Sequence, residues 1–333
     1  MKLADWPHGA IALLLLFAGR PVTAGDGNPA FDTYAKPGRL IEIAPRRHIN
    51  LRCGGTGKVT IILEAGLGFP SLSWRKVAPS LSRLTRTCAY DRAGLGFSDA
   101  GPMPRDTDAI VRDLEAVLAK AKIAPPYLLV GNSLGGQPAR LFAFRHPERV
   151  AGMVLVDPYV EGQYDAFARI DPSIAADVIA LDKEEKACVE ALRSRMLTVA
   201  QAEQRDCIAS PDPAFSTRLM AVLRAQRMSP ASFETSYSET LMLDTTNARI
   251  LELERRDLSP IPIIVLSANQ NFEGTSSAAT RAALLTEQRR LHAKLAALSS
   301  AGEVRRVEAK HVIQSSNPKA VIDAVSDILK KVK

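Results

Sequence analysis

A serine between two glycines is the residue of this sequence with the clearest capacity for nucleophilic chemistry. Ser133 lies in a Gly-x-Ser-x-Gly pentapeptide, with Gly131 and Gly135 two residues before and after it. Glycines at these positions let two backbone segments pass closely, which suits a serine held on a strained turn with its hydroxyl raised. Because a serine hydroxyl is a weak nucleophile until a base takes its proton, the motif also requires a base.

The expected base is His311. It follows a predicted strand, 304–307, and so falls at the edge of a sheet where ligands bind. An imidazole at that edge can take the serine proton and later return it to a leaving group. The remaining histidines are expected in an N-terminal leader, a hairpin, a helix end and a helix centre, namely His8, His48, His146 and His292.

A carboxylate is needed to orient the imidazole and to stabilise its charged form. Asp157 ends a predicted strand, 150–156, that follows the helix after the serine, so it lies on the same sheet edge. Glu273, in the loop after the next predicted strand, is the alternative. Asp91 is expected to be structural, either pairing with Arg92 or capping its own turn.

Alternating patterns predict the elements that position these residues. An apolar run, 127–130, leads into the serine turn, and an apolar-periodic helix with Pro138 in its first turn follows it. The amide groups and the dipole at the start of that helix would face an oxyanion formed at the serine. Further predicted strands are 39–43, 48–53, 59–63, 87–90 and 261–266, and further predicted helices are 72–84, 108–121, 276–298 and 318–329.

The predicted elements imply a mostly parallel sheet covered by helices on both faces, with one interruption. Residues 159–256 are charged and helical in pattern and contain no buried-strand run, which predicts an inserted helical cap. The predicted division of the chain is therefore a leader at 1–24, a core at 25–158, the cap at 159–256, and the second part of the core at 257–333.

Composition and leader sequence suggest an exported globular chain. The 333 residues are 46% hydrophobic and 24% charged, enough for a large core with an inserted subdomain. Lys2, a short apolar centre and small residues up to Ala24 predict a secretory signal peptide that is cleaved after Ala24 and is too short to span a membrane. A lipid anchor or an uncleaved anchor is the alternative, because Asp5 opposes the charge of Lys2. The net charge of +7 is not gathered in a basic run, so no nucleic-acid partner is expected.

Four cysteines in an exported chain favour disulfides. The economical pairing joins Cys53 to Cys88, in neighbouring predicted strands, and Cys188 to Cys207, in the predicted cap. Four free thiols are the alternative, since connectivity does not follow from sequence. No CxxC motif or cysteine–histidine cluster has metal-ligand spacing, so no metal is expected.

Several ordered motifs together resemble the α/β-hydrolase fold family, from the end of the predicted signal peptide onward. The motifs are 63–68, 90–98, the turn at Ser133, 149–157, and 311–313 before a helix that starts with proline. The resemblance implies an eight-stranded, mostly parallel sheet with a helical cap inserted after the sixth strand. It also implies an oxyanion hole formed by the backbone N–H groups of Leu67 and Leu134.

Two positions depart from the family pattern. Residues 63–68 match the oxyanion loop of the family, and Ala65 stands there where many relatives have histidine. The loop after predicted strand 261–266, where most relatives keep the acid, contains no aspartate between Ser267 and Phe272. Some relatives with a cap, such as haloalkane dehalogenases, instead use the strand end occupied here by Asp157.

The expected function is an exported serine hydrolase that cleaves a carboxylic ester, or a related acyl bond, of a small molecule through an acyl-enzyme, without metal or organic cofactor. Two alternatives stay open at this point. One is a cofactor-free perhydrolase or haloperoxidase that uses the same triad, and the other is a non-catalytic ligand-binding protein. A serine nucleophile disfavours epoxide hydrolysis and dehalogenation, because the enzymes of this fold that catalyse those reactions attack carbon with a carboxylate. Oligomeric state is not predicted.

Overall fold

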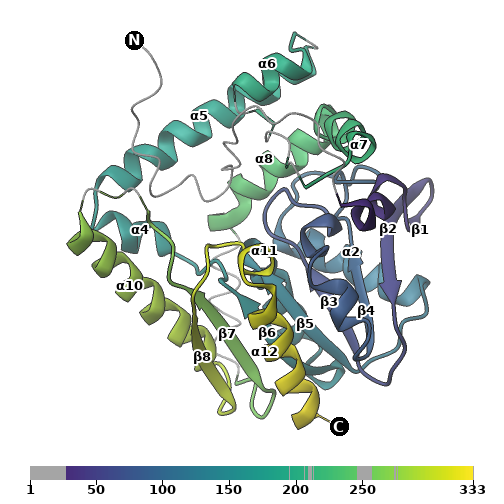
Figure 1. The fold of residues 1–333 in the computed structure, drawn as a ribbon, viewed down its shortest axis with the longest axis vertical. Coiled ribbons are helices and arrows are strands. Elements are labelled where there is room, and N and C mark those ends of the chain that lie inside the picture. Colours follow the sequence, from purple (N-terminus) through teal and green to yellow (C-terminus); the bar gives the residue numbers. More distant parts are fainter. Residues whose placement is uncertain are drawn as a thin grey trace.

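One eight-stranded sheet organises the described chain (Figure 1). The computed structural model describes residues 28–332 except 195, 206, 209–211, 213, 246–256, 274 and 276. The predicted signal peptide therefore lies outside the described residues. The strand order is β1-β2-β4-β3-β5-β6-β7-β8. The strands are β1 (Arg39–Ala44), β2 (Arg47–Gly54), β3 (Thr60–Glu64), β4 (Arg86–Tyr90), β5 (Tyr127–Asn132), β6 (Val150–Val156), β7 (Ile263–Ala268) and β8 (Gly302–Val307).

The sheet is mostly parallel. The β1–β2 and β2–β4 pairs are antiparallel, whereas all pairs from β4–β3 to β7–β8 are parallel. In a parallel array the carboxyl ends of the strands meet at one edge, which is where ligands bind in open α/β sheets. The predicted eight-stranded, mostly parallel sheet with helices is thus confirmed.

Helices cover both faces of this sheet. The helices of the described chain are α1 (Ala78–Leu81), α2 (Thr107–Lys120), α3 (Gly136–Arg145), α4 (Gln163–Ala168), α5 (Ser173–Arg193), α6 (Val199–Gln204), α7 (Thr217–Arg227), α8 (Pro230–Thr245), α10 (Ala278–Ala296), α11 (Ile313–Ser316) and α12 (Pro318–Lys331). Along β5, Leu129 packs in one apolar cluster with α2, α3 and α10, and its neighbours Leu128 and Val130 pack in another with α1 and α12. The alternation of side chains along a strand explains why these strands are apolar throughout.

One predicted helix is absent, and most of the other predicted elements differ at an end by one or two residues. The helix predicted at 72–84 is wrong, because the chain forms a 3-10 turn, Ser71–Trp74, and then the single-turn α1. Pro79 has no N–H for the Arg75 carbonyl, so a continuous helix cannot pass this point. The strand predicted at 261–266 begins instead at Ile263, because Pro262 cannot donate to the ladder.

Helices α4 to α8 occupy the connection between β6 and β7, and in Figure 1 α5 to α8 lie beyond one end of the sheet. The predicted end of the cap near residue 256 lies outside the described residues. Both expected disulfides are present: Cys53 and Cys88 face each other across β2 and β4, and Cys188 of α5 is bonded to Cys207 after α6.

The turn from β5 into α3 is a close backbone crossing. A Cβ placed on Gly131 would lie 2.3 Å from the Gly135 carbonyl oxygen, and one on Gly135 would lie 2.5 Å from the Glu64 carbonyl oxygen. These are backbone atoms, which cannot move aside as a flexible side chain can. The two glycines of the pentapeptide therefore permit β5, the turn and the end of β3 to pack directly on one another.

We expect Gly131→Ala to destabilise the fold by about 3 kcal/mol, because the added methyl overlaps backbone atoms. Urea unfolding monitored by circular dichroism measures the effect. Gly162→Ala is the control, since Gly162 has positive φ but no atom within 4 Å of an added Cβ, and its cost should be the backbone strain alone, about 1 kcal/mol. Equal stabilities of Gly131→Ala and the wild type would contradict the crossing argument.

Candidate active site

Ser133 lies at the carboxyl end of β5 in a strained conformation. Its φ is 51°, in the left-handed region that non-glycine residues rarely adopt. Its carbonyl oxygen accepts a hydrogen bond from the Tyr159 amide at 3.0 Å, which ties the turn to the segment after β6. The residue begins a 3-10 helix, Ser133–Gly135, that leads into α3. The strained turn is thus bonded to the segment after β6 and continues directly into α3.

His311 and Asp157 are directly paired. The ring Nδ1 lies 2.7 Å from Asp157 Oδ2, and the two side chains are 13% and 3% exposed. A proton on Nδ1 that is donated to the carboxylate leaves Nε2 as the basic nitrogen of the neutral ring. This is the tautomer that a serine-activating histidine needs.

The Asp157 carboxylate is buried but fully hydrogen bonded. Oδ1 accepts from the Ala268 amide at 2.8 Å and from Gln288 Nε2 at 2.9 Å, and Oδ2 accepts from Asn271 Nδ2 at 2.8 Å in addition to His311. Burial acts to raise the pKa of Asp157, but the hydrogen bond and charge of His311 and the amide donor outweigh it, so the pKa is lowered. The carboxylate is therefore ionised at neutral pH.

The loop after β7, which lacks the expected aspartate, supplies donors instead of an acid. Ala268, the last residue of β7, donates its backbone amide to Asp157, and Asn271 of the loop donates its side-chain amide. Glu273, the alternative acid, has a 53% exposed side chain that pairs with Lys310 at 3.4 Å, so the structure does not bring it to the His311 ring.

Sequence reasoning missed two residues of α10 beside the acid. Gln288 donates to Asp157, and His292 is 2% exposed with Nε2 3.2 Å from the Pro158 carbonyl oxygen. Burial lowers the pKa of His292, so it is a neutral ring that donates to that carbonyl. Their spacing of four residues places both on one face of a helix, which is the signal that could have suggested a polar face toward the site.

Asn132 connects the serine turn to the His311 loop. Its Nδ2 donates to the Val156 carbonyl at 2.9 Å and to the His311 carbonyl at 3.5 Å, and its Oδ1 accepts from Gln314 Nε2 at 2.9 Å. Between the Ser133 hydroxyl and the His311 ring, both described, there is no hydrogen bond. Such bonds are often long before substrate binds and shorten in the complex.

Leu67 and Leu134, whose amides are the expected oxyanion donors, share one buried apolar cluster with Tyr159 and Leu243. Leu134 lies in the first turn of the 3-10 helix, where amide groups have no partner within the helix. A Cβ on the neighbouring Gly66 would lie 3.6 Å from Ser133 Cβ, so the loop that follows β3 borders the serine directly.

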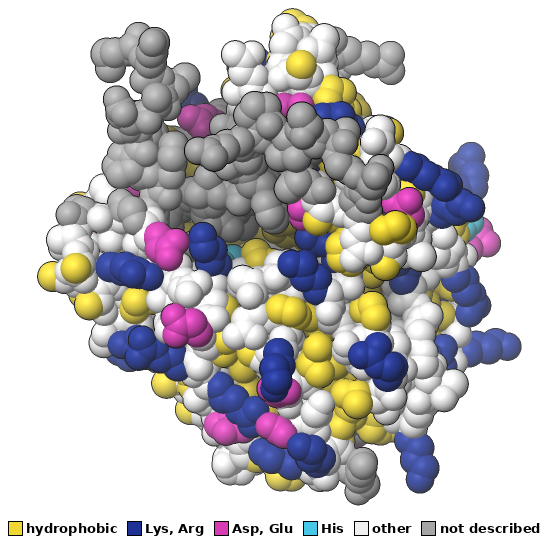
Figure 2. Space-filling model, in the orientation of Figure 1, with side chains coloured by type: hydrophobic (Ala, Val, Ile, Leu, Met, Phe, Trp, Pro, Cys, Tyr) yellow, Lys and Arg dark blue, Asp and Glu magenta, His cyan; other side chains and the backbone are white. Residues whose placement is uncertain are grey.

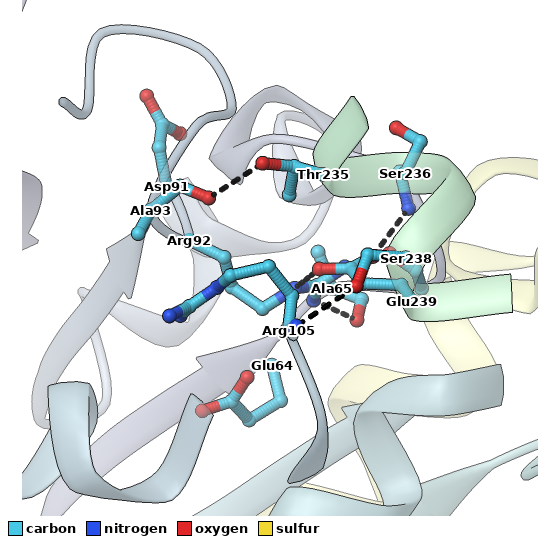
Figure 3. A network of polar contacts seen from close by, with 12 residues as sticks. Glu64, Ala65, Asp91, Arg92, Ala93, Arg105, Thr235, Ser236, Ser238 and Glu239 are labelled. Carbon is cyan, nitrogen blue, oxygen red and sulfur yellow. Dashed lines mark hydrogen bonds and ion pairs between the residues drawn. The ribbon is translucent and has the colours of Figure 1, made fainter. Parts of the chain in front are cut away.

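Arg92 is buried in a polar network that includes Ala65, which follows β3, and Glu239 of α8 (Figure 3). It donates to the Ala65 and Gly66 carbonyls and forms an ion pair with Glu239 of α8. Of the two structural roles expected for Asp91, the structure shows the cap of its own turn and no ion pair with Arg92 among the described residues. Asp91 does cap its turn, since it accepts from the Phe97 amide at 3.0 Å, and it also accepts from Asn50 Nδ2 and the Ser71 amide.

Glu64, at the end of β3, is a second buried carboxyl in this network. Tyr90 Oη donates to Glu64 Oε1 at 2.5 Å, and Oε2 is buried with no hydrogen-bond partner among the described residues. Burial raises the pKa of Glu64 to about 7, against the lowering effects of Arg92 and of the Tyr90 hydrogen bond.

His48 and His146 have carboxylate partners other than Asp157. His48 pairs with Asp99 and His146 with Glu115, each through a partly exposed side chain. His8 lies outside the described residues. No group of three or more His, Cys, Asp or Glu side chains in the described ranges could hold a metal ion.

Neither the charges on the face seen in Figure 2 nor the described helices indicate a nucleic-acid or membrane site. Figure 2 shows lysine and arginine side chains spread over the visible face among acidic and apolar ones rather than gathered in one patch. Within the described chain, every helix is too short or too polar to traverse a bilayer.

We expect Glu64 to make stability depend on pH. With a pKa of about 7 when folded and an ordinary value of 4.5, the carboxyl stabilises the fold fully below pH 4.5, and this contribution is lost as the pH rises through 7. At about 1.4 kcal/mol per pH unit of difference, the loss is about 3 kcal/mol. Urea unfolding from pH 4 to 8 should show this decrease in the wild type and not in Glu64→Gln. Parallel pH curves for the two proteins would contradict it.

Comparisons with known proteins agree with this architecture. An uncharacterised protein of Bacillus subtilis is 38% identical over 111 residues, which cover 33% of this chain and 44% of that protein. N-formylmaleamate deformylase of Pseudomonas putida is 34% identical over 131 residues, which cover 39% of this chain and 48% of that protein. The chain thus matches less than half of the length of these relatives.

A solved structure and a family model extend the comparison. The enol-lactonase of Burkholderia xenovorans LB400 superposes with a TM-score of 0.58 at 18% identity, covering 88% of this chain and 100% of that one, which shows a shared fold. The model of the alpha/beta hydrolase fold family matches residues 59–259, more than half of the sequence. That match includes the serine turn and Asp157, and this chain belongs to the alpha/beta hydrolase fold family.

Proposed function

We propose that this protein is a serine hydrolase that cleaves carboxylic esters of small molecules through an acyl-enzyme on Ser133. His311 is the general base, and Asp157 is the acid that orients it. The observation that carries the proposal is the 2.7 Å contact of His311 Nδ1 with a buried, ionised carboxylate at the edge where the strained serine turn ends. The name of the deformylase relative describes removal of a formyl group, which is also an acyl group.

The proposed reaction proceeds in two halves. His311 takes the Ser133 proton at Nε2 while the serine oxygen attacks the carbonyl carbon, and the oxyanion accepts hydrogen bonds from the Leu67 and Leu134 amides. The imidazolium then protonates the leaving alcohol as the ester C–O bond breaks. In the second half, water loses a proton to the same imidazole, attacks the acyl-serine and releases the acid, which restores the serine hydroxyl.

Two cavities beside the oxyanion loop support a small-molecule substrate. One, of about 110 Å³, is lined by Leu67 and Gly68 on the loop and by Phe233 and Tyr237 of α8. The other, of about 60 Å³, extends from Phe69 to Val312, the neighbour of His311, and to α7. In this proposal the helices between β6 and β7 form the cap, and its apolar side chains receive the acyl or alcohol group of the ester.

We further propose that the protein is exported after cleavage of the segment 1–24. Both disulfides support this, because disulfides persist in oxidising compartments and are rare in the cytosol.

We expect a fluorophosphonate probe to label the wild type and not Ser133→Ala, because only an activated serine reacts with it. On a chain-length series of nitrophenyl esters, Asp157→Asn should lower kcat by about 10³-fold or more, since the imidazole loses its orienting charge.

Glu273→Gln is the matched control, because it neutralises an exposed carboxylate of the neighbouring loop. Its kcat should stay within about twofold of the wild type, as for other surface changes. If Glu273→Gln loses turnover and Asp157→Asn keeps it, the assigned acid is wrong. A wild type that the probe does not label would contradict the hydrolase proposal itself.

A further inference from the structure

We propose that Arg92 and Glu239 form a positioning pair that aims the Leu67 amide into the oxyanion hole, so that helix α8 completes the catalytic site from across the fold. This inference rests on the proposed function, in which Leu67 donates to the oxyanion. Neither side chain is assigned a contact with the substrate. Both act through the backbone of the oxyanion loop.

The contacts of Arg92 determine which way the loop peptides face. Nη1 donates to the Ala65 carbonyl at 2.7 Å and Nη2 to the Gly66 carbonyl at 2.6 Å. A trans peptide is planar, with its C=O and N–H on opposite edges. The Leu67 N–H belongs to the same peptide as the Gly66 carbonyl, so it must point away from Arg92.

The same contacts strengthen the Leu67 donor. A carbonyl that accepts a charge-assisted hydrogen bond polarises its peptide, and the N–H at the other end becomes a better donor. The Gly66 carbonyl also accepts from the Phe69 amide at 3.1 Å, which closes the turn around Leu67. The peptide that presents the proposed donor is therefore held at its carbonyl by two partners.

Glu239 fixes the other side of Leu67. Its Oε2 accepts from the Gly68 amide at 2.9 Å and from Arg92 Nη2 at 2.8 Å, and its Oε1 accepts from Arg92 Nε at 2.6 Å. Because the Gly68 amide is occupied by this carboxylate, it is not the oxyanion donor. Helix α8 also packs closely here, since a Cβ on Gly68 would lie 2.9 Å from Ser236 Oγ.

The pair is buried, which makes each member dependent on the other. The side chains of Arg92 and Glu239 are 1% and 0% exposed. Removal of one charge leaves the other buried without compensation, whereas replacement of both by apolar groups of similar volume is often neutral for stability. This difference separates a positioning role from a merely stabilising one.

Helix α8 has other contacts with the core that do not touch the oxyanion loop (Figure 3). Thr235 Oγ1 donates to the Ala93 carbonyl at 3.3 Å, and Ser238 Oγ accepts from the Arg105 amide at 2.9 Å. Both lie on the same helix within four residues of Glu239. They provide controls that weaken the docking of α8 and leave the loop contacts in place.

The test compares Glu239→Gln with Thr235→Val and Ser238→Ala in the full-length enzyme. Glutamine has one acceptor where the carboxylate has two, so its NH₂ group must face a donor of Arg92 or Gly68. We expect kcat for a nitrophenyl ester to fall about 10²-fold with KM within about twofold. The controls should keep kcat within about threefold, after normalisation to the fraction of serine that reacts with a fluorophosphonate.

Two further measurements isolate the oxyanion hole. The Ki of a trifluoromethyl ketone, whose serine adduct places an oxyanion in the hole, should rise in Glu239→Gln as kcat/KM falls. Amide hydrogen exchange of segment 64–70 should be faster in Glu239→Gln than in either control, a result that does not depend on activity.

The double variant Arg92→Met/Glu239→Met tests the alternative that the pair only stabilises the fold. It also replaces Glu239→Gln in the activity test if that single variant does not fold. We expect its melting temperature to be near that of the wild type and its kcat to remain low by about 10²-fold. Wild-type kcat in Glu239→Gln or in the folded double variant would overturn this inference alone. An unlabelled wild type would overturn the proposed function with it.

Discussion

Direct backbone packing between the end of β3 and the serine turn is the constraint on which the rest of this site depends. Gly131 and Gly135 allow it, because a methyl group on Gly135 would overlap the Glu64 carbonyl and one on Gly131 would overlap the Gly135 carbonyl. With no side chain between them, the serine turn and the oxyanion loop form one packed unit. The strained turn at Ser133 therefore packs directly on the loop that contains Leu67.

Charged groups orient what this packing brings together. The oxyanion loop is rich in glycine, so it has few side chains to hold it, and hydrogen bonds from Arg92 to the Ala65 and Gly66 carbonyls take their place. A buried guanidinium needs a counter-charge, and Glu239 supplies it from α8. The result is that a helix inserted after β6 is joined to a loop that follows β3 by an interaction that neither segment could make alone.

Local patterns in the sequence predicted much of this structure. The parallel strands are recognisable because they are buried on both faces, and Ser133, Asp157 and His311 are predicted site residues because each follows a strand at the same sheet edge. Pro79 was visible in the sequence, but its effect on the helix predicted at 72–84 was missed. The Arg92–Glu239 pair, separated by 147 positions, has no local pattern, since any of the 36 acidic residues could have been the partner. Only the three-dimensional packing of α8 selects it.

The carboxylate of Asp157, directly after β6, accounts for the absence of an aspartate from the loop after β7. Asn271 donates to Asp157 Oδ2 at 2.8 Å, and the adjacent oxygen is held by Ala268 and Gln288. An aspartate at position 271 would place a second carboxylate against the first, and like charges at that distance cannot both be ionised without a large cost. One imidazole can be oriented by one carboxylate. A carboxylate at the end of β6 is therefore best stabilised by amide donors, which here come from Ala268 at the end of β7, Asn271 in the following loop and Gln288 of α10.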